Sequence, residues 1–306
     1  MKNTLNRARS FPVRKLWLTT LALGLFAAAL SITPSGSANH PVLVEGNCDS
    51  PVPGTTIVTA GTCGDFDGDG RIGTAEDTDG ADRIFGTIGA AIGPGTGAAA
   101  GTGANQNGRV IIVKSGRFSE VLLITGANGN VQLEAAPGVE ANIDAVLQGD
   151  PAGGNNARQS SSGIIVEAPA DRRVTLRNLT IRNWVTGVEV RGDSHVFIDN
   201  CRIDNNVGTG IIATGNSRLT VDHSQITATG YRVGTLGDAP RTVTPANGNG
   251  IEFQMNSSGV VANTSITGSF GVGIARFTGG SVNIFHVVFS DNRVAGTSGG
   301  VTPISF

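Results

Sequence analysis

Apolar and polar residues alternate along short blocks in the second half of the chain, and the alternation changes phase once within each block. Five such blocks align, and they start 22, 23, 40 and 23 residues apart. They are V-T-L-R-N-L-T-I (174–181), V-F-I-D-N-C-R-I (196–203), L-T-V-D-H-S-Q-I (219–226), G-V-V-A-N-T-S-I (259–266) and V-N-I-F-H-V-V-F (282–289). Apolar or small residues occupy block positions 1, 3, 6 and 8. Because successive strand residues face opposite sides, each block predicts two short strands joined by a tight bend.

The bend falls at block position 5, and its residue is Asn178, Asn200, His223, Asn263 or His286. Asparagine tolerates the left-handed backbone region that a tight bend needs, and stacked amides can hydrogen-bond from repeat to repeat. Each block leads on to a glycine and an apolar residue, and these pairs are Gly187-Val188, Gly210-Ile211, Gly250-Ile251 and Gly273-Ile274. We therefore expect three short strands in each repeat of about 23 residues.

This repeat resembles the right-handed parallel β-helix of the pectin-lyase-like superfamily, over at least residues 163–292. Residues 109–124 and 130–135 resemble opening coils, and a short helix over 84–92 is expected to cap the open N-terminal end. A β-sandwich, the alternative, would not explain repetition in register. The expected fold is all-β: a right-handed parallel β-helix solenoid over residues 83–306, with a short N-terminal capping helix.

The first 38 residues carry five basic groups and no acidic ones, and residues 16–30 are an apolar run. After this run comes Pro34, and small residues then lead to Ala38. This order is typical of a secretory signal peptide, whereas a membrane anchor, the alternative, needs about 20 apolar residues. We expect residues 1–38 to be removed, no membrane span to remain, and the protein to be secreted to the extracellular space, the periplasm or the cell surface.

Glycine is abundant, with 45 residues in 306, while aromatic residues make up only 5%. The hydrophobic fraction of 39% is too high for a disordered chain, and the glycines lack the three-residue period of collagen. The formal charge is −2, and it becomes −7 when the first 38 residues are removed. Such a surface repels phosphate backbones, so we expect no nucleic-acid partner.

Residues 65–76 read D-F-D-G-D-G-R-I-G-T-A-E. Four carboxylates occupy loop positions 1, 3, 5 and 12, a glycine occupies position 6, and position 7 offers its backbone carbonyl. The expected ligands are Asp65, Asp67, Asp69, Arg71 through its carbonyl, and Glu76. The loop resembles an EF-hand calcium loop and, more loosely, a dockerin calcium repeat. It predicts a structural Ca²⁺ that fixes an N-terminal segment spanning residues 39–82.

Three cysteines are present. In an oxidising compartment Cys48 and Cys63 could close a short loop before the acidic segment. Cys201 stands alone in a strand pattern, and we interpret it as a small buried apolar side chain, because no histidine or acid is placed to activate it.

In the strand after each glycine, the alternation directs one set of side chains to solvent. This outward set includes Glu167, Glu189, Arg191 and Glu252. Neighbouring coils lie about 4.8 Å apart, so Glu167 and Arg191 are expected to lie close together, with Glu189 and Glu252 two coils apart. The insertion at 229–249 precedes this strand and could wall one side of a groove.

Two functions fit these features. The first is a non-catalytic, calcium-binding β-helix, expected to be a monomer, that binds or decorates acidic polysaccharide or a cell-surface glycan. The second is implied by the resemblance, since related folds include calcium-dependent lyases, and it makes the protein a lyase or hydrolase of uronate-rich polymers. In that case Glu189, Arg191, Glu167 and Glu252 would be the catalytic residues, with carboxylates for calcium and an arginine as base. The other interpretation of these charges is ordinary ion pairing along the solenoid, of the kind expected in adjacent coils between Arg177 and Asp199 and between Arg182 and Asp204.

Overall fold

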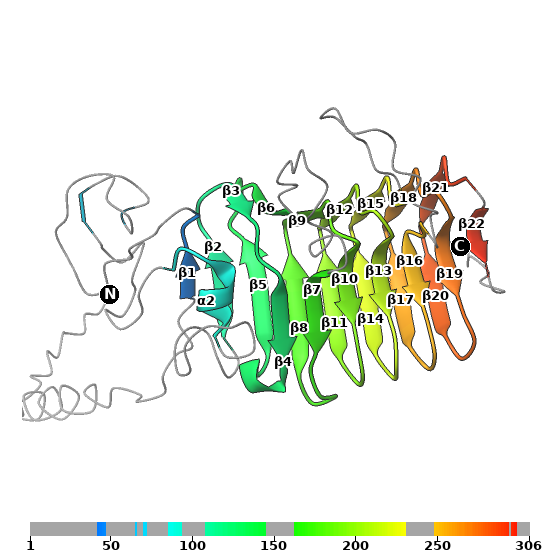
Figure 1. Cartoon of the computed structure of the whole chain (residues 1–306), viewed down its shortest axis with the longest axis horizontal. Helices are drawn as coiled ribbons and strands as arrows, with labels where there is room; N and C mark the ends of the chain where they lie inside the picture. Colours follow the sequence, from blue (N-terminus) through cyan, green and yellow to red (C-terminus); the bar gives the residue numbers. More distant parts are fainter. Residues whose placement is uncertain are drawn as a thin grey trace, which may run out of the picture. The chain divides into compact units, whose positions relative to one another are not determined.

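The computed structural model describes residues 42–46, 65, 70–71, 85–93, 108–144, 162–230, 248–293 and 295–298. All of them lie in the unit Asn39–Phe306. Within these residues the strands form three parallel sheets, and each full coil gives one strand to each sheet. Figure 1 shows the coils following one another along the chain. The fold is a parallel β-helix, as the sequence predicted.

Each of the three sheets collects its strands in coil order. The first sheet contains β1 (Val42–Val44), β2 (Arg109–Ile112), β5 (Val131–Ala135), β8 (Arg173–Arg177), β11 (His195–Asp199), β14 (Arg218–Asp222), β17 (Ser258–Ala262) and β20 (Ser281–Phe285). The second contains β3 (Gly116–Phe118), β6 (Ala141–Asp144), β9 (Leu179–Arg182), β12 (Arg202–Asp204), β15 (Gln225–Thr227), β18 (Ser265–Thr267) and β21 (Val288–Ser290). The third contains β4 (Leu122–Thr125), β7 (Ser162–Glu167), β10 (Thr186–Val190), β13 (Thr209–Ala213), β16 (Ile251–Phe253), β19 (Val272–Arg276) and β22 (Ala295–Ser298).

The core is built from columns of equivalent residues. In the third sheet Ile164, Val188, Ile211 and Ile251 pair in register from coil to coil, and each is fully buried. The first and second sheets contribute similar aliphatic columns from their own inward positions. Burying apolar surface contributes about 25 cal/mol per Å², so the stacked columns supply the main stabilisation. They also fix the register, because a slip of one residue would turn each column toward solvent.

The predicted bends are confirmed, because every residue at block position 5 has a positive φ. The angles are 57° for Asn178, 50° for Asn200, 44° for His223, 46° for Asn263 and 47° for His286. The predicted amide stacking is also confirmed at the first two, where Asn200 Nδ2 donates to Asn178 Oδ1 over 2.8 Å. The amide stack is interrupted at His223, which occupies the bend position of the next coil. There Asn263 Nδ2 donates to Asp222 Oδ1 over 2.9 Å rather than to a bend amide.

A short helix, α2 (Ile88–Ile92), packs against β1, β2 and β4 of the first coil. Thr87 is its N-cap, and the Glu120 carboxylate accepts the N–H groups of Ile88 and Gly89 over 2.7 Å each. Burial raises the pKa of Glu120 despite these bonds. A short helix is therefore present as expected, but it begins at Ile88 rather than at residue 84. Phe85 instead forms a bridge with Val44, Thr87 is the N-cap, and Ile84 lies outside the described residues.

The first sheet already begins at β1, which pairs in parallel with β2. Residues 65–76, the predicted calcium loop, therefore lie in the sequence between two neighbouring strands of the solenoid, rather than before its first strand. The predicted signal peptide, Cys48 and Cys63, and residues 231–247 of the insertion lie outside the described residues. Within the described part, no helix has the length and apolar character that a membrane crossing would require.

Candidate functional site

The outer face of the third sheet carries three of the four predicted residues close together. Glu189 lies on β10, Arg191 directly follows that strand, and Glu167 ends β7 in the preceding coil. The backbone N–H of Arg191 donates to the carbonyl of Val166 over 2.9 Å, which places Arg191 beside Glu167. The expected proximity of Glu167 and Arg191 is confirmed.

Glu189 is held by donors on two sides. Arg191 Nε donates to Oε1 over 2.8 Å, and Arg191 Nη2 donates to Oε2 over 3.0 Å. Ser162 Oγ, from the preceding coil, donates to Oε2 over 2.6 Å. A guanidinium that grips both carboxylate oxygens in this way is a strong and geometrically fixed contact.

These contacts shift the pKa values of both Glu189 and Arg191. Burial of the Glu189 carboxyl raises its pKa, but the hydrogen bonds from Arg191 and Ser162, together with the charge of Arg191, leave that pKa below its ordinary value. The hydrogen bond to Glu189 raises the pKa of Arg191, and the charges of Glu189 and Glu167 add to this rise. A general base works best with a pKa near the working pH, and the two shifts carry both pKa values away from neutral pH. Glu189 and Arg191 therefore form an ion pair in which each partner stabilises the charged form of the other.

Glu252 differs from the expectation, because it points out of the sheet and yet is 0% exposed. Three donors surround its carboxylate. They are Thr209 Oγ1 at 2.7 Å and Asn249 Nδ2 at 3.0 Å, both on Oε1, and Gln254 Nε2 at 2.6 Å on Oε2. The prediction that Glu252 faces solvent was wrong, since alternation along a strand gives the direction of a side chain but not the groups that cover it.

Glu189 and Glu252 are two coils apart in the same column, as expected, with Ile212 between them. Each carboxylate accepts a hydrogen bond from a hydroxyl of the preceding coil and another from the side chain two residues later in the chain. The two hydroxyl donors, Ser162 and Thr209, were not predicted from the sequence. A signal for them exists, because Ser162 and Thr209 each stand immediately before one of the repeated glycines.

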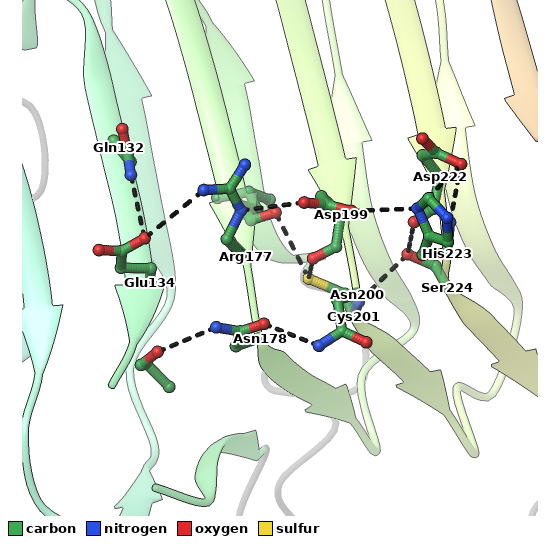
Figure 2. A network of polar contacts seen from close by, with 12 residues as sticks. Gln132, Glu134, Arg177, Asn178, Asp199, Asn200, Cys201, Asp222, His223 and Ser224 are labelled. Atoms are coloured by element: carbon green, nitrogen blue, oxygen red, sulfur yellow. Dashed lines mark hydrogen bonds and ion pairs between the residues drawn. The ribbon is translucent and has the colours of Figure 1, made fainter. Parts of the chain in front are cut away.

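A second polar network lies on the first sheet at the edge beside the bends (Figure 2). Arg177 lies between Glu134 and Asp199, at 4.0 Å from the former and 2.9 Å from the latter. His223 Nδ1 is 3.3 Å from Asp222 Oδ1 and 3.7 Å from Asp199 Oδ1. The pairing of Arg177 with Asp199 across adjacent coils confirms the ion pairing expected there.

The analogous pairing predicted for Arg182 is only partly confirmed. Arg182 and Asp204 are in register, but Arg182 Nε donates to Asp144 of the preceding coil over 3.0 Å. Asp144 is fully buried, and it also accepts Asn183 Nδ2 over 2.6 Å and contacts Arg117 at 2.7 Å. Arg182 is in register with an acid on each of its two neighbouring coils, Asp144 and Asp204. Register alone therefore does not determine which acid Arg182 contacts.

Asp199, Asp222 and His223 each offer one ligand atom, and these atoms lie within 4.8 Å of one another. The same carboxylates already serve other groups, because Asp199 accepts Arg177 and Asp222 accepts Asn263. A guanidinium 2.9 Å from Asp199 opposes a metal cation at this position. The arrangement therefore acts as an ion-pair network that links consecutive coils.

The described part of the acidic loop contains a turn at Gly70. The N–H of Gly70 donates to Asp65 Oδ2 over 3.0 Å, and Gly70 has a φ of 80°. Asp65 is buried, and Arg71 at the next position is exposed. Asp67, Asp69 and Glu76 lie outside the described residues, so the ligand set stays a prediction.

Cys201 is 2% exposed, and its thiol lies near the carbonyls of Leu176 and Asp199. Burial raises the pKa of this thiol to about 12, partly offset by backbone hydrogen bonds. A thiol with that pKa is not a nucleophile at neutral pH. The interpretation of Cys201 as a packed core side chain is confirmed.

Comparison with known proteins identifies the same kind of fold. Residues 162–302 match the family model described as right handed beta helix region. Among solved structures, that of pectate lyase Pel9A matches with 10% identity and a TM-score of 0.38, covering 86% of this chain and 80% of that chain. Two structures of the pectin methylesterase from Aspergillus niger match with 11% identity and TM-scores of 0.31 and 0.30, each covering 72% of this chain and 88% of that chain. No curated protein matches the sequence. These likenesses are too distant to assign an activity, so a function must be argued from the residues of this chain.

Proposed function

We propose that this protein is a secreted, non-catalytic parallel β-helix that binds an acidic polysaccharide or cell-surface glycan. The observation that carries the non-catalytic part is the state of three of the four candidate catalytic residues. Glu252 is buried among three donors, and Glu189 is gripped by Arg191. A lyase of the kind considered above needs an arginine that gives up its proton, and the ion pair moves the pKa of Arg191 in the opposite direction.

The binding part rests on the resemblance of the repeat to polysaccharide-active β-helices and on the character of the surface. A stack of parallel strands presents side chains of one kind at a constant spacing of about 4.8 Å, which suits a ligand that is itself a repeating polymer. The scarcity of tryptophan and tyrosine disfavours neutral sugars, which usually stack on such rings. An acidic glycan can instead be held by cations.

Binding without turnover is the first expected result. The protein lacking residues 1–38, supplied with Ca²⁺, should be retarded in a gel that contains polygalacturonate or alginate and not in one that contains dextran. The same mixtures should develop neither the ultraviolet absorbance of unsaturated uronates nor new reducing ends. If the wild-type protein forms product, and product formation is lost in Arg191→Ala but retained in Arg276→Ala, the protein is a lyase and this proposal is wrong.

We also propose that residues 65–76 bind one structural Ca²⁺. The support is the spacing of the four carboxylates and the Gly70 turn closed on Asp65. The expected ligands are Asp65, Asp67, Asp69 and Glu76, with the carbonyl of Arg71. The ion would neutralise acids that otherwise repel one another and would fix the chain between β1 and β2.

Removing calcium is expected to lower the thermal midpoint of the wild-type protein. A ligand that binds only the folded state stabilises it by RT ln(1 + [L]/Kd), which is about 2.7 kcal/mol at one hundred times Kd. Differential scanning fluorimetry with Ca²⁺ and with a chelator measures the difference, and Asp65→Ala should abolish it. Equal midpoints under both conditions in the wild-type protein would contradict a structural ion.

A further inference from the structure

The outer face of the first sheet carries a basic strip, which we define as Arg173, His195 and Arg218. These residues begin β8, β11 and β14, and they pair in register, His195 with Arg173 on one side and with Arg218 on the other. Both arginines are exposed and His195 is half-buried. β8, β11 and β14 lie side by side in Figure 1. The strip therefore runs across three consecutive coils rather than along one strand.

Among the described residues, the two arginines of the strip have no carboxylate partner. Neither guanidinium forms an ion pair or a hydrogen bond there, although the backbone N–H of Arg173 donates to Asn130 Oδ1 over 2.7 Å. The acids nearest in sequence are engaged elsewhere, because Asp171 contacts Arg172 at 3.7 Å and Asp193 accepts an asparagine amide of the next coil over 2.9 Å. This differs from Arg177 on the same sheet, which is paired with Asp199. The two arginines are thus free to bind an anion from outside.

The next column along the same strands is suited to the body of a sugar. It consists of Thr175, Phe197 and Thr220, which are in register and half-buried. A partly exposed phenyl ring packs against the C–H face of a sugar ring, and the hydroxyls beside it can bond to sugar hydroxyls. Beyond this column lie Asp199 and Asp222, which can accept hydroxyl protons.

We propose that the basic strip and Phe197 form a binding site for a linear acidic glycan, whose chain crosses the coils and whose carboxylate or sulfate groups pair with Arg173 and Arg218. The two guanidinium groups are two coils apart, so they lie about 10 Å from one another if they extend alike. A planar guanidinium fork matches a carboxylate or sulfate with two parallel bonds. This inference rests on the proposed function and places it on the first sheet, away from the Glu189 and Arg191 pair of the third.

The same face disfavours nucleic acid. Binding of nucleic acid depends on many phosphate contacts made by lysine and arginine. Here the two unpaired arginines are accompanied by Asp199 and Asp222 on the same three strands, and the whole chain has a formal charge of −2. A polymer with one charge on each sugar and uncharged hydroxyls between them fits this mixed face better than a continuous row of phosphates.

The test measures the affinity of the protein lacking residues 1–38 for polygalacturonate, dextran sulfate and dextran by titration calorimetry. Each lost charge-assisted contact is expected to weaken binding by about tenfold, so Arg173→Gln with Arg218→Gln should weaken it by about one hundredfold. Phe197→Ala should weaken it by several-fold. Arg276→Gln is the matched control, because Arg276 is an exposed arginine on the third sheet, and it should bind as the wild type does.

The possible outcomes distinguish a failure of the proposed site from a failure of the proposed function. Wild-type affinity in the double variant, with an unchanged thermal midpoint, would overturn the basic strip and leave the proposed function standing. No binding of either acidic polymer by the wild-type protein would overturn both. Preference for polygalacturonate over dextran sulfate, or the reverse, would identify the anion and support the site. Tighter binding of single-stranded DNA than of both acidic glycans would overturn the glycan proposal in favour of nucleic acid.

Discussion

Replacing Gly210 with alanine is expected to lower the free energy of unfolding by about 3 kcal/mol, at the upper end of the cost of overpacking a core. A Cβ at this position would lie 2.6 Å from the carbonyl oxygen of Gly250 and 2.9 Å from Cγ2 of Ile226. The first of these atoms is backbone of the next coil, so it cannot turn away as a flexible side chain would. The spacing of two coils must increase, and with it the length of several hydrogen bonds. Urea denaturation followed by circular dichroism measures the change.

Gly116→Ala is the matched control, since Gly116 is also in a strand of the solenoid. There a Cβ would meet the Cα of Gly46 at 3.6 Å, which is an ordinary contact. Alanine in place of glycine at such a position narrows the unfolded ensemble and changes stability by less than about 1 kcal/mol. Equal unfolding curves for Gly210→Ala and Gly116→Ala would show that close stacking of coils does not require the repeated glycines.

The fold was predictable because its main determinants are local and repeat. A tight bend between two short strands leaves a phase change in the alternation and demands a positive φ, and both are visible in single blocks of eight residues. The repeated glycine, which lies at the start of the third strand in Gly187 and Gly210, reflects the close approach of the next coil. Repetition then sets the register, since only one alignment of neighbouring coils buries every apolar column.

The polar contacts were less predictable because they depend on a choice between neighbours. Arg182 has an acid in register on each side, Asp144 and Asp204, and it bonds to Asp144. Each of these acids also serves other groups, because Asp204 accepts bonds from Arg202 and Thr227 while Asp144 contacts Asn183 and Arg117. Neither fact is contained in the spacing of the repeats. The same holds for Glu189, whose bond from Ser162 depends on a side chain 27 residues away.

The candidate site therefore divides into a part that the sequence could give and a part that it could not. Alternation placed Glu167, Glu189 and Arg191 correctly on the outer face of one sheet. The basic strip was not predicted, because Arg173, His195 and Arg218 belong to no motif and form a strip only when three coils stack. Burial of Glu252 depends on the groups that cover the sheet, and these are set by the whole fold.

Loss of the Glu252 carboxylate should cost stability rather than activity. In Glu252→Ala the donors on Thr209, Asn249 and Gln254 lose their acceptor, and the first two of these residues are buried. Each unsatisfied buried group costs about 1–3 kcal/mol, and because such effects are not additive we expect a total of about 3 kcal/mol. Glu167→Ala removes an exposed carboxylate at the end of β7 and should change stability by no more than about 0.5 kcal/mol. Urea denaturation of both variants, beside the binding titration, tests the assignment. If Glu252→Ala unfolds like the wild type but no longer binds polygalacturonate, the carboxylate contacts the ligand, and the third sheet rather than the first carries the glycan.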